Sequence, residues 1–420
     1  MSVKAKKLLV IGYVWPEPES SAAGSRMLQL LQFFLSNNFE ITFATTAKDS
    51  NYRFEIESLG IKTAHIELNK DSFNEFASSL QPNIVLFDRF MMEEQFGWRI
   101  EETCPNAIKI LDTEDLHFLR NARKKALQQP EKFDSFLRNS DLAKREIAAI
   151  YRCDISLIIA DFEMEILQKS FAIPPSILHY LPYALSEKKL KITVDLPNFD
   201  KRSDFVFIGN FLHEPNWNAV LHLKNKIWPE IRKKSLNANL LIYGAYPSSK
   251  VYNLHNEKEG FLIKGRAEQA FDVLKTARIL LAPLQFGAGL KGKFVDAMQT
   301  GTPSVTTSIG VEGITSAENW NGFVTDNDIE FVEKAIELYT NENLWNQKSK
   351  KGPEILNSRF SASDLLPKLR EKIEVVSSNL DQHRLENFTG SMLKFHYNRS
   401  TYFMSKYIAE KEENRAKGTV

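Results

Sequence analysis

The residues best suited to chemistry lie between positions 279 and 314. An apolar run there leads into a glycine turn at Gly287–Gly289, and a stretch with helical spacing follows it. Amide N–H groups in the first turn of a helix attract phosphate, and glycines let a ligand approach the backbone closely. Lys291 and Lys293 add positive charge, and the carboxylate of Asp296 can accept hydrogen bonds from ribose hydroxyls. The pattern predicts a nucleoside-diphosphate site; the alternative is a tight turn followed by solvated lysines.

A second segment with suitable residues, positions 110–120, follows another apolar run. It brings Asp112, Asp115 and His117 to the end of a predicted strand, where open parallel sheets bind their ligands. Their spacing is not that of a metal site. The two aspartates can equally cap the following helix, and a lone histidine can equally be structural. His117 is the candidate that we carry forward.

Gly24 follows the first predicted strand and opens a helix, so it is a further candidate for a ligand-facing loop. A simple tight turn explains the same residue nearly as well. Arg26, two positions later, is expected to be solvated rather than catalytic.

The segment FGAGLKGKFVDAMQTGTPSVTTSIGVEGI resembles the donor-site segment of retaining GT-B glycosyltransferases of family four. The shared features are a Gly-x-Gly turn, a basic residue, a lysine, an acidic residue, Ala-Met, Gly-x-Pro-x-Val and a closing Glu-Gly. The glutamate of that last pair is Glu312. A looser similarity extends over Phe205–Ile231 and Leu241–Gly244, and to the turn after the first strand.

The resemblance implies a role for each matching residue of the donor segment. Asp296 stands where the family has the second glutamate of a pair, which holds the donor ribose. Ala288 stands at the first glutamate of that pair, a departure that affects the usual contact with the donor sugar. The family's arginine and lysine after the first strand of the second domain have no clear match, where His213 is the only candidate cation. Lys291 is therefore expected to supply the charge for the diphosphate.

The resemblance also implies the remaining donor-binding residues. Gly287 and Gly289 form the turn that faces the diphosphate, together with Lys293 and Glu312. Gly24 belongs to a glycine loop that faces the donor phosphate and the acceptor. His117 corresponds to a histidine near the donor sugar and, with Lys291, is the expected catalytic residue. Glycosyltransferases of this kind generally need no bound metal, so neither a metal nor another cofactor is expected.

Short β-rich apolar runs alternate with amphipathic stretches along the chain, and this happens twice. Such alternation predicts an α/β fold with two Rossmann-like, doubly wound parallel sheets. The six runs of the first half are Lys7–Val14, Glu40–Thr46, Lys62–Leu68, Asn83–Asp88, Ala107–Asp112 and Ile155–Ala160. Those of the second half are Phe205–Gly209, Asn239–Tyr243, Gly260–Lys264, Ile279–Pro283, Pro303–Thr307 and Gly322–Thr325.

A chain of 420 residues suits two such domains. We expect an N-terminal, acceptor-side domain at 1–185, a charged linker at 186–203 and a C-terminal donor domain at 204–375. A helical tail at 376–420 then returns to the N-terminal domain, which buries the aromatic stripe of its last helix. The alternative for this tail, whose aromatic and basic residues alternate, is peripheral contact with an anionic membrane.

The composition narrows the class of partner. There are 54 Lys and Arg against 53 Asp and Glu, so no strong field favours nucleic acid. The two cysteines form neither a disulfide framework nor a zinc motif. The apolar run near the N-terminus is too short for a signal peptide, and no segment approaches the length of a membrane span. A cytoplasmic protein is expected, with the inner face of a membrane as the alternative location.

These features together predict an enzyme that transfers a sugar from a nucleoside-diphosphate sugar to a hydroxyl group. The acceptor is expected to be a glycan, a lipid-linked molecule or a protein, in the synthesis of a cell-surface polysaccharide or glycan. Two alternatives stay open: a GT-B sugar-nucleotide epimerase or phosphorylase, and a GT-B-shaped scaffold that has lost catalysis. Ala288 and the missing basic pair favour the scaffold.

Overall fold

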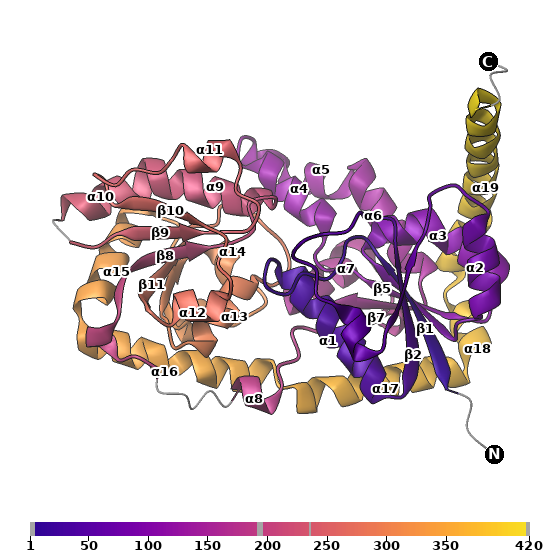
Figure 1. Cartoon of the computed structure of the whole chain (residues 1–420), viewed down its shortest axis with the longest axis horizontal. Helices are drawn as coiled ribbons and strands as arrows, with labels where there is room; N and C mark the ends of the chain where they lie inside the picture. Colours follow the sequence, from indigo (N-terminus) through magenta and orange to yellow (C-terminus); the bar gives the residue numbers. More distant parts are fainter. Residues whose placement is uncertain (1–4, 191–195, 235–236, 417–420) are drawn as a thin grey trace.

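The computed structural model describes residues 5–190, 196–234 and 237–416, which form two parallel sheets side by side (Figure 1). Within these residues the first sheet has seven strands in the order β3-β2-β1-β4-β5-β6-β7. Its central strands are continuous apolar runs because helices cover both faces. The bounds are β1 Lys6–Gly12, β2 Phe39–Thr45, β3 Lys62–His65, β4 Ile84–Asp88, β5 Ile108–Asp112, β6 Ile155–Ile158 and β7 Leu178–Tyr180.

The helices of the first half follow these strands in the chain. The N-terminus of the first helix is fixed by Ser21, whose hydroxyl accepts a hydrogen bond from the amide of Gly24. The bounds are α1 Ala22–Ser36, α2 Ser72–Leu80, α3 Phe90–Thr103, α4 His117–Ala126, α5 Phe133–Arg138, α6 Asp141–Arg152, α7 Asp161–Phe171 and α8 Glu187–Leu190.

The second sheet has six strands among the described residues, in the order β10-β9-β8-β11-β12-β13, all parallel. Its strands are β8 Ser203–Ile208, β9 Leu240–Tyr243, β10 Phe261–Gly265, β11 Ala277–Ala282, β12 Ser304–Thr306 and β13 Gly322–Val324. Its helices are α9 Glu214–His222, α10 Trp228–Lys233, α11 Ser249–Tyr252, α12 Ala270–Leu274, α13 Gly292–Gln299, α14 Ser308–Val311 and α15 Asp328–Thr340.

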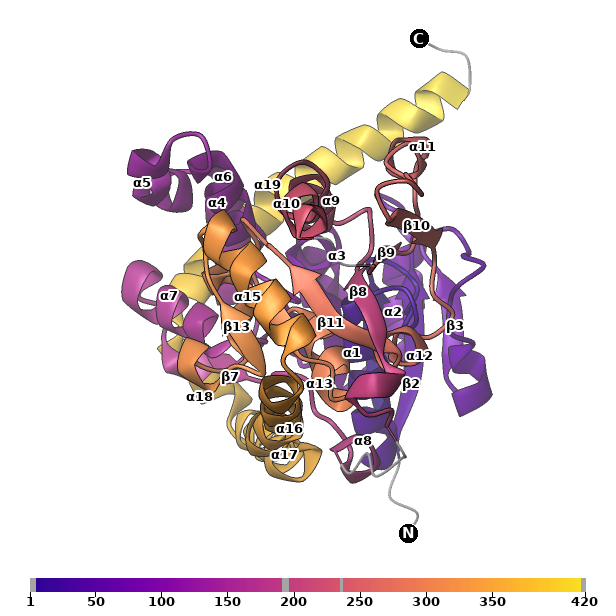
Figure 2. The same cartoon turned by 90° about the vertical axis from the view of Figure 1, so that its left-hand side faces the viewer.

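Two helices run along one side of both halves, α16 (Glu342–Arg359) and α17 (Ala362–Ser378) (Figures 1 and 2). α16 packs on the second half, where Trp345 and Leu356 are buried in its core. α17 packs on the first half through Leu369 and Val376. The chain therefore passes from one core to the other between these two helices.

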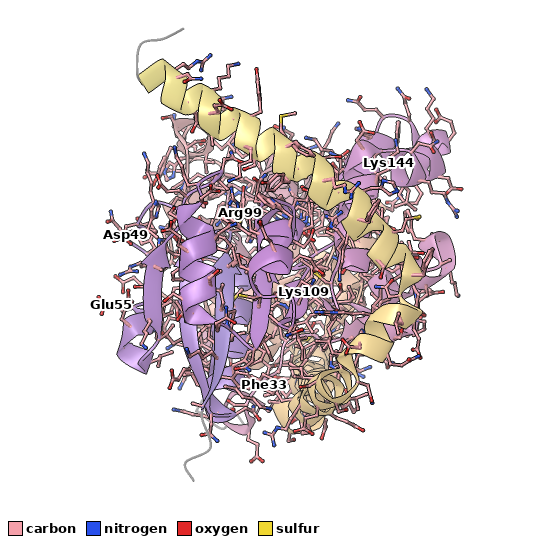
Figure 3. All side chains as sticks on the ribbon, turned by 90° about the vertical axis from the view of Figure 1, so that its right-hand side faces the viewer. Phe33, Asp49, Glu55, Arg99, Lys109 and Lys144 are labelled. Carbon is pink, nitrogen blue, oxygen red and sulfur yellow. The ribbon has the colours of Figure 1, made fainter. Side chains whose placement is uncertain are left out.

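The chain ends in α18 (Leu380–Glu386) and the long helix α19 (Phe388–Ala416), which lies against α3 and α6 of the first half (Figure 3). The Arg99 guanidinium donates a hydrogen bond to the hydroxyl of Ser405 at 3.0 Å, and the hydroxyl of Tyr397 donates to the carbonyl of Glu94 at 2.8 Å. The C-terminal part of α19 extends beyond the body of the molecule (Figures 1 and 2).

The α/β class with two doubly wound sheets and a helical tail, predicted from the alternation of apolar runs, is confirmed. Each predicted run overlaps a strand. The sequence interpretation missed β7, a strand of only three residues that follows two prolines. The structure contradicts the expectation that the tail's aromatic stripe is buried, since Phe395 and Phe403 are exposed. Part of the predicted linker, residues 191–195, lies outside the described residues. The exact domain limits stay a prediction.

Candidate active site

The strand order of each sheet reverses at one point, and open parallel sheets bind ligands there. In the first sheet β1 lies between β2 and β4, and in the second β8 lies between β9 and β11. The loop after β1 leads into α1, whose first turn contains Gly24, and the loops after β8 and β11 carry His213 and the Gly287–Gly289 turn. Topology therefore places Gly24 at the switch point of the first sheet, and His213 and the glycine turn at that of the second, whereas His117 follows β5.

The Gly287–Gly289 turn is held by side chains of the first half. Gly289 has a φ of +63°, which favours glycine, and a Cβ at this position would lie 2.8 Å from the Cβ of Asp115. Its amide donates a hydrogen bond of 2.8 Å to the carboxylate of Glu163. The carbonyl of Gly287 accepts a hydrogen bond of 2.8 Å from Arg123. Between them, Ala288 is buried in the core of the first half, so the turn forms the seam between the halves.

Lys291 is the residue just before α13, and its side chain is buried at this seam. Its Nζ lies 3.5 Å from the carboxylate of Glu312 and 5.7 Å from the ring centroid of Phe162. Burial lowers the pKa of Lys291 to about 8, although Glu312 opposes the shift. Glu312 has a second basic partner, because Arg123 donates hydrogen bonds of 2.7 Å to both of its carboxylate oxygens. Lys291 thus carries positive charge that its neighbours compensate only in part.

Lys293 lies in the first turn of α13 and points toward α9. Its Nζ donates a hydrogen bond of 2.7 Å to the side-chain carbonyl of Asn216 and lies 4.1 Å from the ring centroid of Phe207. Burial lowers its pKa to about 7, and no carboxylate among the described residues offsets this. His213, at the start of α9, has a pKa lowered to about 4 by burial and by the charge of Arg120. The local sequence left open that these lysines face water, but neither Lys291 nor Lys293 does so in the structure.

Asp296 lies one turn into α13, on the side that faces the first half. Burial raises the pKa of its carboxyl to about 6, and Glu19 adds to the rise. Its carboxylate has no hydrogen-bond partner among the described residues. Nearby, a Cβ at Gly292 would lie 2.9 Å from the Cβ of Ala22, so the start of α13 touches the start of α1. This close approach explains the glycine at the first position of the helix.

His117 begins α4, and its ring lies between two carboxylates. Its Nδ1 is 3.4 Å from carboxylate oxygens of both Asp115 and Glu146, and it lies 3.1 Å from the carbonyl of Asp115. Burial lowers the pKa of His117, but the two carboxylates outweigh burial, so the pKa is raised. Asp115 also pairs with Arg120, which helps to hold its pKa below the ordinary value against the effect of burial. His117 is therefore a histidine suited to carry a positive charge next to the glycine turn.

Gly24 has a packing role in this structure. A Cβ there would lie 2.4 Å from a backbone atom of Glu17, and its amide is already bonded to Ser21. The expectation that Arg26 is solvated is wrong. Arg26 is buried, pairs with Asp112 at 2.8 Å and donates a hydrogen bond of 2.6 Å to the carbonyl of Leu181. Asp112 thus binds a side chain of its own half.

Three residues that the fold brings to the site carry no signal in the local sequence. Arg123 and Glu163 contact the glycine turn, and both come from helices of the first half. Burial raises the pKa of Glu163 to about 8, and the nearby Asp115 adds to the rise. Glu114, with a φ of +60°, is half-buried, and one buried oxygen of its carboxylate is unpartnered within the described part of the chain. In that part no group of three or more His, Cys, Asp or Glu side chains is arranged to hold a metal; metal independence stays a prediction.

Residues 202–341 match the profile of a family described as "Glycosyl transferases group 1", which covers the second sheet and the glycine turn. No curated protein matches the chain. Among solved structures, the chain is similar to TarM of S. aureus, crystallised with fondaparinux, alpha-GlcNAc-glycerol and UDP. The TM-score is 0.67 at 12% identity, over 87% of this chain and 99% of that one.

Two further structures are similar over most of their length. Sucrose-phosphate synthase from Thermosynechococcus elongatus has a TM-score of 0.63 at 13% identity, over 89% of this chain and 99% of that one. HepE from Anabaena, in complex with UDP and glucose, has a TM-score of 0.61 at 10% identity, over 88% and 100%. The two sheets with their switch-point loops share the GT-B fold of these structures, and the family match over residues 202–341 supports a glycosyltransferase enzyme. The resemblance to GT-B glycosyltransferases that was inferred from the donor segment is confirmed, whereas the retaining character stays a prediction.

Proposed function

We propose that this enzyme transfers a hexose or related sugar from a nucleoside-diphosphate sugar to an acceptor hydroxyl, with retention of the anomeric configuration. The observation that carries the proposal is the start of α13. There a helix N-terminus, Lys291 and Lys293 concentrate positive charge at the switch-point loop after β11. A diphosphate is the dianionic group that such a site would bind.

The other donor contacts are assigned by position. Asp296 would accept hydrogen bonds from the ribose, since its carboxylate lies one turn further along the same helix. Glu312 and the Gly287–Gly289 turn would lie against the diphosphate and the sugar. The similar structures of TarM and HepE are described with UDP, which supports a nucleotide donor.

Catalysis in this proposal is mainly electrostatic. The leaving diphosphate gains negative charge as the sugar departs, and Lys291 with the dipole of α13 stabilises it in a site screened from water. His117 would be a second positive group next to the turn, because Asp115 and Glu146 favour its protonated form. Closing the two halves holds the donor and the acceptor hydroxyl within reacting distance. The reaction between two molecules then becomes effectively unimolecular.

The acceptor, the pathway and the location belong to the same proposal. We assign the acceptor to the cleft face of the first half and to the class of glycans, lipid-linked molecules or proteins, in the synthesis of a surface glycan. A cytoplasmic location is supported by Cys104 and Cys153, which are both free and buried.

The test is a binding screen of nucleoside diphosphates by calorimetry, followed by transfer assays with the matching sugar nucleotides and NMR of the product's anomeric proton. We expect one nucleotide to bind and a retained product to form. If none binds, the scaffold alternative replaces the enzyme. Turnover of a sugar nucleotide without any acceptor would point instead to an epimerase, and a product of inverted configuration would remove the retaining mechanism.

A further inference from the structure

The long helix α19 has one side that nothing in the described chain covers. Six of its large apolar residues are between 46% and 74% exposed: Phe388, Met392, Phe395, Phe403, Met404 and Tyr407. Five of them, all except Met404, recur at spacings that place them on one side of the helix, which we call the outer face. Isolated exposed apolar residues are ordinary, but a row of five on one helix indicates a binding surface.

The rotation of α19 is fixed by contacts on its opposite side. On the side turned to the body, the Arg152 guanidinium lies 4.1 Å from the ring centroid of Tyr397. Tyr402, at the edge of the outer face seven positions after Phe395, also reaches the body through an edge contact with Trp98. Arg99 donates a hydrogen bond to Ser405, as described above. Figure 3 shows the helix lying across the first half above Arg99. Because the contacts of Tyr397 and Ser405 use the inner side, the outer face must point away from the body.

The charge of this helix has one sign over most of its length. From position 388 to 409 the sequence contains Lys394, Arg399 and Lys406 and no Asp or Glu. Arg399 is on the outer face, where its guanidinium lies 4.5 Å from the ring centroid of Phe395. Aromatic rings alternating with basic side chains are typical of helices that lie in the interface of an anionic membrane.

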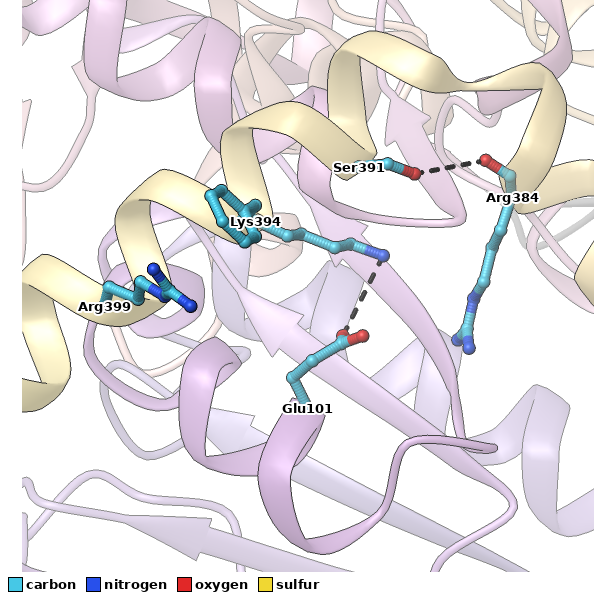
Figure 4. Close-up of a pocket in the computed structure, with 6 residues that line it drawn as sticks. Glu101, Arg384, Ser391, Lys394 and Arg399 are labelled. Carbon is cyan, nitrogen blue, oxygen red and sulfur yellow. Dashed lines mark hydrogen bonds and ion pairs between the residues drawn. The ribbon is translucent and has the colours of Figure 1, made fainter.

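A cationic pocket opens beside the outer face. It has a volume of about 460 Å³ and is lined by Glu101, Arg384, Ser391, Lys394, Phe395 and Arg399 (Figure 4). Its one carboxylate, Glu101, is paired with Lys109 and lies 3.8 Å from Lys394. Arg384 is paired with Asp154 at 2.8 Å. The charges of Glu101 and Lys109 cancel, as do those of Arg384 and Asp154. The positive charges of Lys394 and Arg399 therefore remain in the pocket.

The charges also decide between two kinds of partner. Pairing the outer faces of two copies would bring helices together that have only basic charges between positions 388 and 409, and like charges repel. Lys406 is paired with Asp71 at 2.5 Å, so an anionic lipid surface would offer the opposite charge to Lys394 and Arg399, together with an apolar layer for the rings. No described helix is long and apolar enough to cross a bilayer, so α19 would lie in its surface.

We propose that the outer face of α19 docks on an anionic lipid bilayer, with a lipid phosphate in the pocket formed by Lys394 and Arg399. The proposal concerns a surface on the first half away from the glycine turn, and it stands independently of the transferase reaction.

The experiment is co-sedimentation of the full chain with phosphatidylcholine vesicles, with and without a minority of phosphatidylglycerol. We expect binding only to the anionic vesicles, weakened by salt. Arg399→Glu should lower the partition coefficient by about tenfold or more, because it reverses a charge at the surface. Phe395→Ser with Phe403→Ser should lower it similarly by removing buried rings.

Matched controls are Lys144→Glu and Ile329→Ser, which change an exposed charge and an exposed apolar residue elsewhere. They should bind like the parent protein, and circular dichroism should show every variant folded. Free inorganic phosphate at the vesicles' phosphate concentration should not displace the protein. The proposal is overturned if the parent ignores anionic vesicles, or if the outer-face variants bind as well as the controls. It is also overturned if ultracentrifugation shows a dimer that these same variants dissociate.

Discussion

Lys291 and Lys293 stand two positions apart, yet their charges are held in different ways. Lys291 shares Glu312 with Arg123, whereas Lys293 has the neutral Asn216 and the ring of Phe207. Burial without full compensation lowers the pKa of both amines, to about 8 and about 7. A bound diphosphate would raise both pKa values toward 10.5, because it favours the charged amines.

The affinity for a nucleoside diphosphate should therefore fall as pH rises above about 7, because the complex binds more protons than the free enzyme in that range. Each coupled lysine adds a slope of up to about tenfold per pH unit. Calorimetry of UDP binding between neutral and alkaline pH measures this slope. Lys293→Ala should flatten its lower part, near pH 7, and Lys291→Ala the part near pH 8. Affinity independent of pH in both variants and parent would show that the phosphates bind elsewhere.

Asp296 is predicted to affect nucleotide binding at acidic pH. Its carboxyl has a pKa raised to about 6 by burial, so a ribose contact that needs the carboxylate weakens below that pH. Asp296→Ala should reduce nucleoside-diphosphate binding by about 1–3 kcal/mol, the usual cost of losing a buried acceptor. Gln299→Ala, at the end of the same helix, is the control and should leave binding unchanged. An unaltered dissociation constant for Asp296→Ala would remove this residue from the site.

At the scale of elements, the glycine turn is positioned by helices of the opposite half. Arg123 of α4 contacts the carbonyl of Gly287, and Glu163 of α7 accepts the amide of Gly289. The same oxygen of Glu163 accepts the amide of Leu116 at 3.1 Å, so one carboxyl joins a loop of each half. Its raised pKa means that it is protonated near neutral pH in the folded state.

Replacing Glu163 tests this junction through stability. The folded pKa of about 8 lies above the ordinary 4.5, so the folded state binds more protons between these values. The contribution of Glu163 to the free energy of unfolding is then complete below pH 4.5 and is lost as pH rises to about 8. Glu163→Gln, which keeps the neutral acceptor, should remove that part of the pH dependence in urea titrations. Glu163→Ala should lose about 1–3 kcal/mol at pH 6, since two amides become unpaired. Parallel pH curves for the parent protein and Glu163→Gln would contradict the protonated carboxyl.

The same contacts show what sequence could predict. Buried parallel strands are continuous apolar runs, so Asn83–Asp88 predicted β4 almost to the residue. The glycine turn and the start of α13 were predicted because their signal is local. Arg123 could not be assigned, since its partner Glu312 lies 189 positions away. Arg26 was misjudged for a similar reason, because its burial depends on Asp112, 86 positions along the chain.

At the scale of the whole molecule, the chain passes between the two halves twice, and backbone hydrogen bonds around Leu185 join the two crossing segments. Leu185 donates its amide to the carbonyl of Phe360 at 2.7 Å, and Ala362 donates to the carbonyl of Leu185 at 3.0 Å. The two crossing segments are thus tied together at one place. Such a place is suited to act as a hinge, because few residues need to change their backbone angles there.

Closure over this hinge should depend on the ion pair between Arg123 and Glu312, whose side chains are only 16% and 22% exposed. Arg123→Ala leaves Glu312 without its bidentate partner at the seam, so we expect a larger radius of gyration in small-angle scattering and weaker binding of the donor nucleotide.

Lys124→Ala is the matched control. It removes the neighbouring pair with Glu214, whose side chains are 46% and 64% exposed, and exposed pairs contribute little. Donor nucleotide should compact the parent and the control, and compact Arg123→Ala only at higher concentration, because binding energy must then also close the halves. If Arg123→Ala scatters like the parent without nucleotide and binds it equally well, the seam does not govern closure, and the donor site would be complete within the second half alone.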